Sequence, residues 1–134
     1  FSPVLPQNGK LALEQFHRTY ARYKEYGMDY QASFAFGERH ILNVNAVLLN
    51  LDDPAFMKRV DPFLRTLISD AAQHGYGEYR AHIDYMDLIA DGYSFNHHAL
   101  RRLNERVKDA LDPAGILAPG KSGIWPKRYR RETK

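Results

Sequence analysis

The segment whose residues are most suggestive of chemistry lies near the C-terminus and matches a phosphate-binding loop. Residues 115–122 read G-I-L-A-P-G-K-S, which fits the pattern G-x-x-x-x-G-K-[ST] letter for letter. A working loop of this kind follows a strand and opens a long helix, because its amides and the helix N-terminus bind the phosphates together. Here a helix and residues 112–113 precede the segment, residues 123–126 follow it, and Pro119 removes one amide donor. We therefore expect no nucleoside triphosphate site.

The six histidines raise the question of a metal site. His97 and His98 are neighbours, so their side chains diverge by about 100° on a helix and cannot bind one ion from one face. The other four have no ligand spacing: His17, His40, His74 and His82. We expect solvated or packed histidines and no metal ligand among them.

The composition excludes several classes of protein. The chain has 134 residues, of which 44% are hydrophobic and 26% charged, as in an ordinary globular domain or a piece of one. A net charge of +3 is too small to imply a nucleic-acid partner, and no stretch approaches the ~18 apolar residues of a membrane span. The absence of cysteine removes disulfides and thiolate metal sites. We expect a soluble protein that binds neither nucleic acid nor membrane. The sequence leaves its compartment open, either cytoplasm or periplasm.

Apolar periodicity in the first half predicts a helix and a hairpin. The helix is expected to begin at the cap Asn8 and to end at Gly27. Its expected apolar face is Leu11, Leu13, Phe16, Tyr20 and Tyr23. Alternation over residues 30–36 and a second apolar run over 40–51 predict an antiparallel pair joined by a turn. The residues before Asn8 form a segment bounded by Pro3 and Pro6 that is expected to lead into the helix.

The second half is expected to be helical. One helical region opens at residues 52–54, restarts at Pro62 with Asp61 as its cap, and ends at Gly75. Its apolar face is Phe63, Leu64, Leu67, Ile68 and Ala71. A shorter helix is expected over residues 81–90. Another is capped by Asn96 and aligns Leu100, Leu103, Val107 and Leu111 on one face.

The C-terminal residues and the small number of strands complete the predicted fold. Coil follows from Ala114, and the basic run 127–131 is expected to be a solvated terminus or a subunit contact. The fold class is therefore α+β. Two strands do not make a sheet with its own stable core, so we expect this chain to complete a larger sheet supplied by other sequence.

Two motifs resemble one family of flavoenzymes. Residues 111–126, L-D-P-A-G-I-L-A-P-G-K-S-G-I-W-P, resemble the C-terminal signature of FAD-linked oxidases and dehydrogenases of para-substituted phenols, the vanillyl-alcohol oxidase and 4-cresol dehydrogenase (p-cresol methylhydroxylase) family. Residues 75–82, G-Y-G-E-Y-R-A-H, are similar to its Gly-Glu-Tyr-Arg segment. The resemblance covers essentially the whole chain, and it is looser over residues 1–60.

The resemblance implies a division of the chain between two domains. Residues 1–75 correspond to the last part of a cap (substrate) domain, and residues 76–134 to the C-terminal segment that returns to the FAD-binding domain. The implied cofactor is FAD, whose phosphate loops and any covalent linkage lie in sequence before Phe1. The implied partners are the remainder of these two domains, a phenolic substrate, further copies in a homo-oligomer and, in some members, a c-type cytochrome. On this interpretation the chain is not a complete enzyme.

The resemblance also implies the reaction and its central residues. The family oxidises the benzylic carbon of a 4-alkylphenol by hydride transfer to flavin, through a p-quinone methide, and it holds the substrate as a phenolate. Tyr79 and Arg80 match the pair that binds the phenolate oxygen, since a tyrosine hydroxyl donates and arginine is always charged. Arg80 is also implied to lie near the flavin pyrimidine edge. The alternative is a tyrosine packed on the core and a surface ion pair of Arg80 with Glu78 or Asp84.

Four further residues are implied at the site. Ser33, Asn43 and Val44 fall on the hairpin that forms part of the substrate cavity wall, and Lys121 matches a basic position facing the flavin. The alternatives are structural hydrogen bonding for Asn43, as for Asn45, and an exposed loop position for Lys121. The family often has a histidine near Asn43; none stands there in this sequence, so no base is assigned to this strand.

Two questions of function stay open at this point. The sequence does not separate an oxidase from a cytochrome-coupled dehydrogenase. A second hypothesis belongs to a different class of function. In it, the chain is a non-catalytic α+β interaction module, or a detached piece with no flavin of its own.

Overall fold

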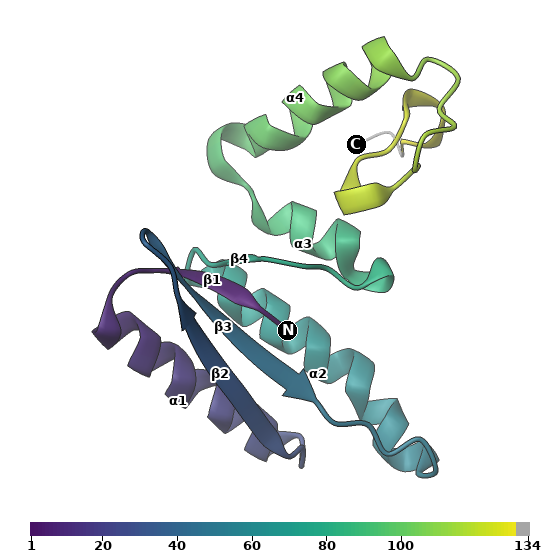
Figure 1. Ribbon diagram of the computed structural model, residues 1–134. Helices are drawn as coiled ribbons and strands as arrows, with labels where there is room; N and C mark the ends of the chain where they lie inside the picture. Colours follow the sequence, from purple (N-terminus) through teal and green to yellow (C-terminus); the bar gives the residue numbers. More distant parts are fainter. Residues whose placement is uncertain (131–134) are drawn as a thin grey trace. The chain divides into compact units, whose positions relative to one another are not determined.

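The computed structural model describes residues 1–130, which form two compact units, residues 1–80 and residues 81 onward. In the first unit a four-stranded antiparallel sheet has one face covered by two helices, α1 (Gly9–Glu25) and α2 (Pro54–Gln73) (Figure 1). The second unit is built of helices and single turns. Helices beside a small antiparallel sheet confirm the α+β class.

The sheet contains twice as many strands as the sequence indicated. Its spatial order is β2 (Tyr30–Phe36), β3 (His40–Val47), β1 (Pro3–Pro6) and β4 (Gly77–Glu78). The β2–β3 hairpin is confirmed, although β3 ends at Val47 rather than at residue 51. The prediction of two strands was wrong because β1 and β4 pair across more than seventy residues of sequence.

Strand β1 contains two prolines, which sequence reasoning takes as evidence against a strand. Its register with β3 pairs Val4 with Leu42, which places Pro3 opposite Asn43. Pro3 has no N–H to donate to the Asn43 carbonyl, and that carbonyl instead accepts from the Asn45 side chain, with Nδ2 3.1 Å away. Asn45 Nδ2 also donates to the carbonyl of Phe1 at 3.2 Å. The buried amide of Asn45 therefore compensates for the proline in the neighbouring strand.

The helix boundaries follow the capping residues in the sequence. Asn8 accepts from the first-turn amides of α1, and Asp53 does the same for α2. Gly27 and Gly75 follow the last turns with positive φ. The expected restart at Pro62 was wrong: α2 is continuous through it, and Asp61 binds Arg65 (Oδ2 to Nε, 2.9 Å) instead of capping.

The buried face of α1 differs from the expected one. The residues it buries are Ala12, Gln15, Thr19 and Tyr23. Leu13 and Tyr20, expected in the core, are 57% and 48% exposed. Gln15 and Thr19 can be buried because they satisfy each other, with Gln15 Nε2 donating to Thr19 Oγ1 at 2.9 Å. For α2 the expected face is confirmed, with Leu64 only half-buried.

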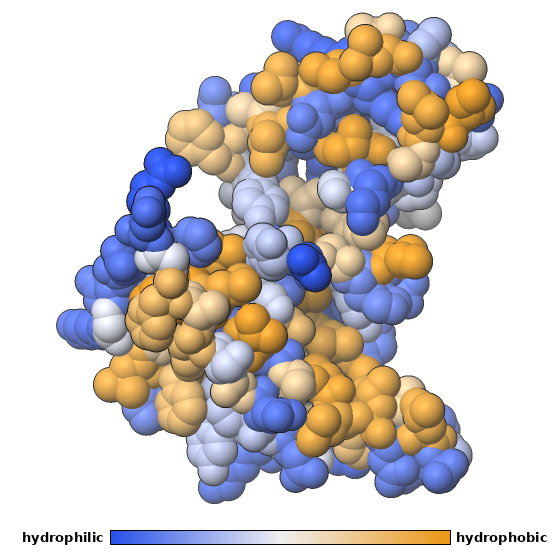
Figure 2. All heavy atoms as spheres, viewed as in Figure 1, coloured by the Kyte–Doolittle hydropathy of each residue, from blue (hydrophilic) through white to orange (hydrophobic). Residues whose placement is uncertain are grey.

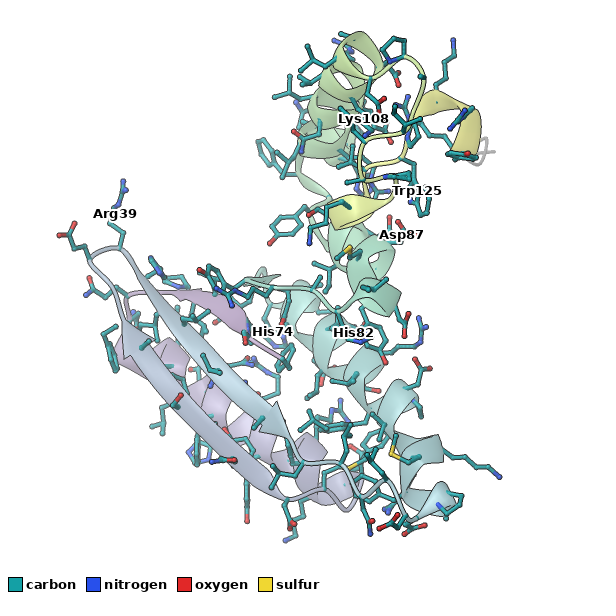
Figure 3. All side chains as sticks on the ribbon, turned by 45° about the vertical axis from the view of Figure 1, so that its right-hand side comes forward. Arg39, His74, His82, Asp87, Lys108 and Trp125 are labelled. Atoms are coloured by element: carbon teal, nitrogen blue, oxygen red, sulfur yellow. The ribbon has the colours of Figure 1, made fainter. Side chains whose placement is uncertain are left out.

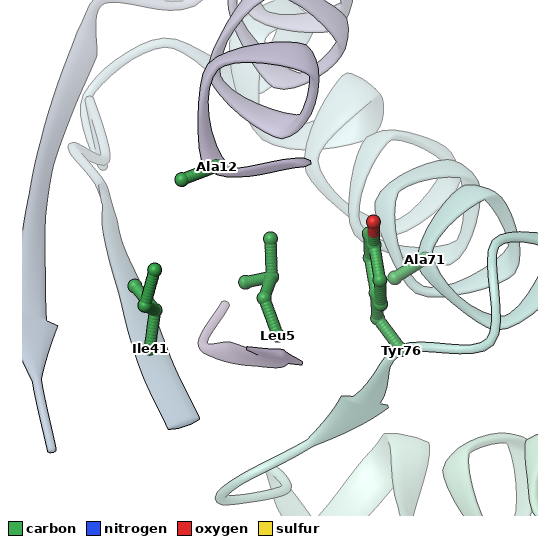
Figure 4. Packing of buried hydrophobic residues seen from close by; sticks show 5 residues of the cluster. All are labelled: Leu5, Ala12, Ile41, Ala71 and Tyr76. Atoms are coloured by element: carbon green, nitrogen blue, oxygen red, sulfur yellow. The ribbon is translucent and has the colours of Figure 1, made fainter. Parts of the chain in front are cut away.

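The core of the first unit lies between the helices and one face of the sheet. Figure 4 shows Leu5 and Ile41 from the sheet facing Ala12 of α1 and Ala71 of α2, with Tyr76 beside them. A second cluster, farther along the helices, consists of Tyr23, Met28, Phe63 and Leu67. The side chains that point away from the helices form the opposite face of the sheet, which we call the open face. It carries Ser2, Ser33, Val44 and Tyr79.

The second unit begins with a turn, η1 (Ile83–Tyr85), and α3 (Met86–Gly92). Helix α4 (Phe95–Leu111) follows, and then two turns, η2 (Lys121–Gly123) and η3 (Lys127–Tyr129). Asn96 is not the expected cap: it has a φ of 46° within a left-handed turn, and its carbonyl accepts from Arg102.

Helix α4 aligns its apolar residues as expected, but within the second unit that stripe is exposed. It consists of Leu100, Leu103, Val107 and Leu111. Over residues 1–130, no helix has both the length and the apolar character needed to cross a bilayer.

Candidate functional site

Tyr79 and Arg80 follow directly after β4, at one edge of the sheet. The backbone N–H of Tyr79 donates to the carbonyl of Ser2 at 2.9 Å, which continues the pairing of β4 with β1 by one residue. Tyr79 is 55% exposed, and the Arg80 guanidinium carbon lies 5.2 Å from the centroid of its ring. A phenol hydroxyl and a guanidinium are therefore presented together on the surface of the first unit.

Of the structural alternative for this pair, the first unit tests the packing of Tyr79 and an ion pair with Glu78, whereas Asp84 belongs to the second unit. Tyr79 lies outside the core, and Arg80 forms no ion pair with a carboxylate of residues 1–80. Glu78 instead turns toward β1, where its Oε1 accepts from the Ser2 N–H at 2.5 Å. Burial raises the pKa of Glu78, and this hydrogen bond acts against that shift. Within residues 1–80, no carboxylate therefore pairs with the charge of Arg80.

Ser33 and Val44 are opposite each other on the open face of the sheet. They form a registered pair between β2 and β3. The alternation of burial puts Val44 on the open face, since its neighbours Asn43 and Asn45 are buried under the helices. Tyr79 is on this face too, because the buried Tyr76 and the partly buried Glu78 place every second residue on the helix side.

The structure places Asn43 apart from Ser33 and Val44. Its side chain is fully buried, faces the helices, and accepts from Asn45 Nδ2 at 3.0 Å through Oδ1. This position favours the structural hydrogen-bonding alternative for Asn43 over contact with a ligand on the open face.

Lys121 belongs to the second unit, where it opens η2 in the C-terminal loop. It is exposed and forms no ion pair with a carboxylate among residues 81–130. Its N–H donates to the Ala118 carbonyl at 3.2 Å. Figure 3 shows Trp125 of the same loop beside Asp87 of α3, and Trp125 Nε1 donates to that carboxylate at 2.8 Å. The loop is anchored through Trp125, and the Lys121 ammonium has no carboxylate partner among residues 81–130.

Asp112 holds the loop in shape, a role that sequence reasoning did not assign. Its carboxylate accepts from the backbone amides of Ile116 and Leu117, both at 3.0 Å, and pairs with Lys108 at 2.8 Å. The hydrogen bond from Lys108, aided by the two amides, lowers the pKa of Asp112 to about 2. The Asp-Pro start of the segment indicated a turn, but the two amides that Asp112 binds lie four and five residues on, beyond the reach of a simple Asx-turn pattern.

The amides of the loop that resembles a P-loop are thus occupied by the protein itself. Besides the two bound by Asp112, the N–H of Gly120 donates to Ile124 and that of Ser122 to the sulfur of Met86. A helix, α4, precedes the segment, as the sequence indicated. These contacts leave no cradle of free amides for phosphate in residues 115–122.

The basic run at the C-terminus is partly built into the unit. Arg130 binds Asp109 with both terminal nitrogens, at 2.9 and 2.6 Å, and donates to the Glu105 carbonyl at 3.2 Å. It is therefore not the solvated position expected from the sequence. Arg131 lies outside the described residues. Over the described part of the chain, no three His, Asp or Glu side chains gather closely enough to hold a metal ion.

Comparison with known proteins gives the family. Residues 12–122 match the family described as FAD linked oxidases, C-terminal domain. The chain belongs to this family. FAD is the cofactor that the family implies, in agreement with the resemblance at the two motifs.

One relative and two solved structures, all enzymes of alkylphenols, are similar to the chain. The chain is 33% identical over 124 residues to the flavoprotein subunit of 4-cresol dehydrogenase [hydroxylating] from Pseudomonas putida, covering 92% of this chain and 23% of that protein. It superposes on 4-ethylphenol oxidase from Gulosibacter chungangensis, in an isoeugenol complex, with a TM-score of 0.92 at 45% identity over 97% of this chain and 25% of that one. It also superposes on the substrate-bound structure of p-cresol methylhydroxylase, with a TM-score of 0.87 and 33% identity. That match covers 93% of this chain and 24% of the other.

These likenesses extend over the whole chain, which spans about a quarter of the length of the relatives it matches. The fold class and the family expected from the sequence are thereby confirmed. The division into cap and FAD-binding segments at residue 75 stays a prediction; the compact units of the structure divide after Arg80, because β4 joins the first sheet.

Proposed function

We propose that this chain is the part of an FAD-dependent oxidoreductase that binds the phenolate of a 4-alkylphenol and supports oxidation of its benzylic carbon. The remainder of the FAD-binding and cap domains is its partner. The observation that carries the proposal is the exposed pair Tyr79 and Arg80, a donor and a permanent cation without a carboxylate partner in their unit.

The chemistry of this pair suits a phenolate. A guanidinium beside the phenol oxygen favours its ionised form, and the Tyr79 hydroxyl adds a hydrogen bond that strengthens with the charge. The phenolate pushes electrons through the ring as the benzylic C–H bond breaks, so loss of a hydride leaves a neutral p-quinone methide. FAD, when bound, supplies the acceptor for that hydride. The role of Arg80 and Tyr79 is to bind the anion and orient the ring.

The open face of the sheet supplies a surface for the ring. Val44 is apolar and exposed, and Ser33 opposite it offers a hydroxyl. The neighbouring registered positions on this face are small or apolar, with Ala35 paired to Leu42 and Val4 paired to Gly77. Figure 2 shows apolar surface over the strands of this unit. A flat aromatic ring fits such a surface better than a charged ligand does.

Two cations of the chain suit the flavin itself. Arg80 and Lys121 are exposed, and each lacks a carboxylate partner among the residues of its unit that the structure describes, 1–80 and 81–130. Negative charge grows on the pyrimidine edge of a flavin as it is reduced, and a nearby cation stabilises it. We assign this role to Arg80 and, separately, assign Lys121 as a cation that faces the flavin.

The experiment that tests the proposal replaces Arg80 by Ala in the FAD-loaded full-length protein. We expect kcat/KM for 4-ethylphenol to fall by roughly 10²–10³-fold, the range seen when one charge-stabilising donor is lost. Binding of an unreactive phenol, measured by calorimetry, should weaken in parallel. Arg39→Ala at the tip of the β2–β3 hairpin (Figure 3) is the matched control and should change neither quantity. Unchanged turnover in Arg80→Ala would overturn the assignment.

We separately propose that the electron acceptor of the reduced flavin is dioxygen. The higher identity with an oxidase, 45% against 33% with a dehydrogenase, favours dioxygen. Stopped-flow reoxidation of the reduced protein tests this, since fast reaction with dioxygen supports an oxidase. Slow reaction with dioxygen together with fast reaction with a c-type cytochrome supports a dehydrogenase instead.

A further inference from the structure

Ser2 lies next to Tyr79 on the open face, and nothing in the sequence pattern drew attention to it. The Tyr79 N–H donates to the Ser2 carbonyl at 2.9 Å, so the two residues are direct cross-strand neighbours. The registered pair of Pro3 with Glu78 confirms this alignment. Side chains of directly opposed residues have Cβ atoms about 5 Å apart. The Ser2 side chain is therefore adjacent to that of Tyr79.

Ser2 has a second neighbour on the other side. Phe1 and Asn45 exchange hydrogen bonds, with the Asn45 N–H donating at 2.8 Å and the Phe1 nitrogen donating back at 3.1 Å. This pairing places Ser2 opposite Val44. Since Val44 is paired with Ser33, four side chains align across the sheet: Ser33, Val44, Ser2 and Tyr79. We name these four the cross-sheet row.

Burial places the Ser2 side chain on the open face. Pro3 and Leu5 are buried against the helices, whereas Ser2 and Val4 are half-exposed, which is the alternation of a strand with one covered face. In the cross-sheet row, Ser2 is thus the small residue between an apolar side chain and the tyrosine of the phenolate pair.

We propose that Ser2 is a specificity-determining residue: its small side chain leaves the space beside Tyr79 that a ring substituent next to the phenol oxygen occupies. This inference rests on the proposed function, because Tyr79 fixes the phenol oxygen. The substituents nearest Tyr79 are those on the ring carbons next to that oxygen, whereas the alkyl group in the para position points away. A larger residue at position 2 excludes substituents next to the phenol oxygen, and it leaves room for the para alkyl group.

A pair of ligands isolates this effect. Isoeugenol carries a methoxy group beside its hydroxyl, and 4-(prop-1-enyl)phenol is the same molecule without it. We would measure the Kd of both by anaerobic calorimetry on the FAD-loaded full-length protein, and kcat/KM for the matching pair 4-ethylphenol and 4-ethyl-2-methoxyphenol.

The expected result is selective. In Ser2→Val, a substitution that suits a strand, isoeugenol should bind roughly tenfold more weakly while 4-(prop-1-enyl)phenol stays within about twofold. Ser2→Ala keeps the space and should leave both ligands within about twofold. Ser69→Val on the exposed side of α2 is the control and should change neither.

Each other outcome has a distinct meaning. Equal weakening of both ligands in Ser2→Val, or no weakening of either, would refute the specificity role while leaving the proposed function intact. Selective loss of isoeugenol in Ser2→Ala would also refute it, because the hydroxyl rather than the space would then matter. If the unsubstituted protein binds neither phenol, the proposed function itself fails.

Discussion

Asp112 shows how one carboxylate can fix a whole loop. It closes α4, pairs with Lys108 and accepts two amides of the loop that follows. Trp125 is the single tryptophan of the chain, and its ring lies against Gly120 of the same loop, where an added Cβ would stand 2.6 Å from it. Tryptophan fluorescence therefore reports directly on the state of this loop.

The lowered pKa of Asp112 predicts an acid transition in the loop. Because the folded-state pKa is about 2 and the ordinary value is 3.8, the stabilisation is present above pH 4 and is lost as the pH falls toward 2. Asp109, whose pKa Arg130 lowers, lies in the same unit. We expect Trp125 emission of the 134-residue chain to change between pH 4 and pH 2.

The variant Asp112→Asn removes this contribution. It should loosen the loop at neutral pH, where Trp125 emission shifts toward that of the acid form, and it should reduce the amplitude of the acid transition. Asp84→Asn, at an exposed acid of η1, is the control and should titrate like the unsubstituted chain. An unaltered acid transition in Asp112→Asn would mean that other carboxylates hold the loop.

At the scale of elements, strand β1 makes a prediction about compensation between residues. Asn45 donates to the carbonyl that Pro3 leaves without a partner, so the two positions are energetically coupled. We expect Asn45→Ala to lower the free energy of unfolding by about 1–3 kcal/mol, the usual cost of leaving a buried polar group unpaired. Urea unfolding followed by circular dichroism measures it.

A double-mutant cycle tests the coupling itself. Pro3→Ala restores the missing N–H, so Asn45→Ala should cost less in that background, by about 0.5–1.5 kcal/mol. Asp61→Ala, which removes the exposed ion pair with Arg65 on α2, supplies the control cycle with Pro3→Ala and should be additive. Additivity of Pro3 and Asn45 would show that the amide serves the strand in another way.

The same elements show what sequence reasoning could and could not reach. The caps Asn8 and Asp53 and the face of α2 were predictable, because they depend on local chemistry and on a regular apolar period. The face of α1 was not, because Gln15 and Thr19 are buried as a mutually satisfied pair, which no hydropathy pattern signals. Strand β1 was missed because its prolines argue against a strand unless their partner is known.

At the scale of the molecule, the candidate site is assembled from four separate segments. Tyr79, Arg80, Ser33 and Val44 were predicted through the family resemblance, the first two on a motif. Ser2 could be found only when the register of β1 with β3 and β4 was known, since that register depends on long-range pairing. A resemblance can therefore locate the residues that a family shares, whereas the structure is needed for the neighbours between them.

The outer edge of β2 has a consequence for hydrogen exchange. Among the described residues, β2 is an edge strand of the sheet. The Gly37 N–H donates to the His40 carbonyl, and this bond fixes which alternate amides of β2 point toward β3. The amides of Gln31, Ser33 and Ala35 then point toward β3, and those of Ala32, Phe34 and Phe36 point outward. Deuterium should enter the second set quickly and the first slowly, giving a period of two along one strand. Where a further strand pairs with this edge, both sets of amides should exchange slowly, so the exchange pattern of these six amides reports whether the sheet continues.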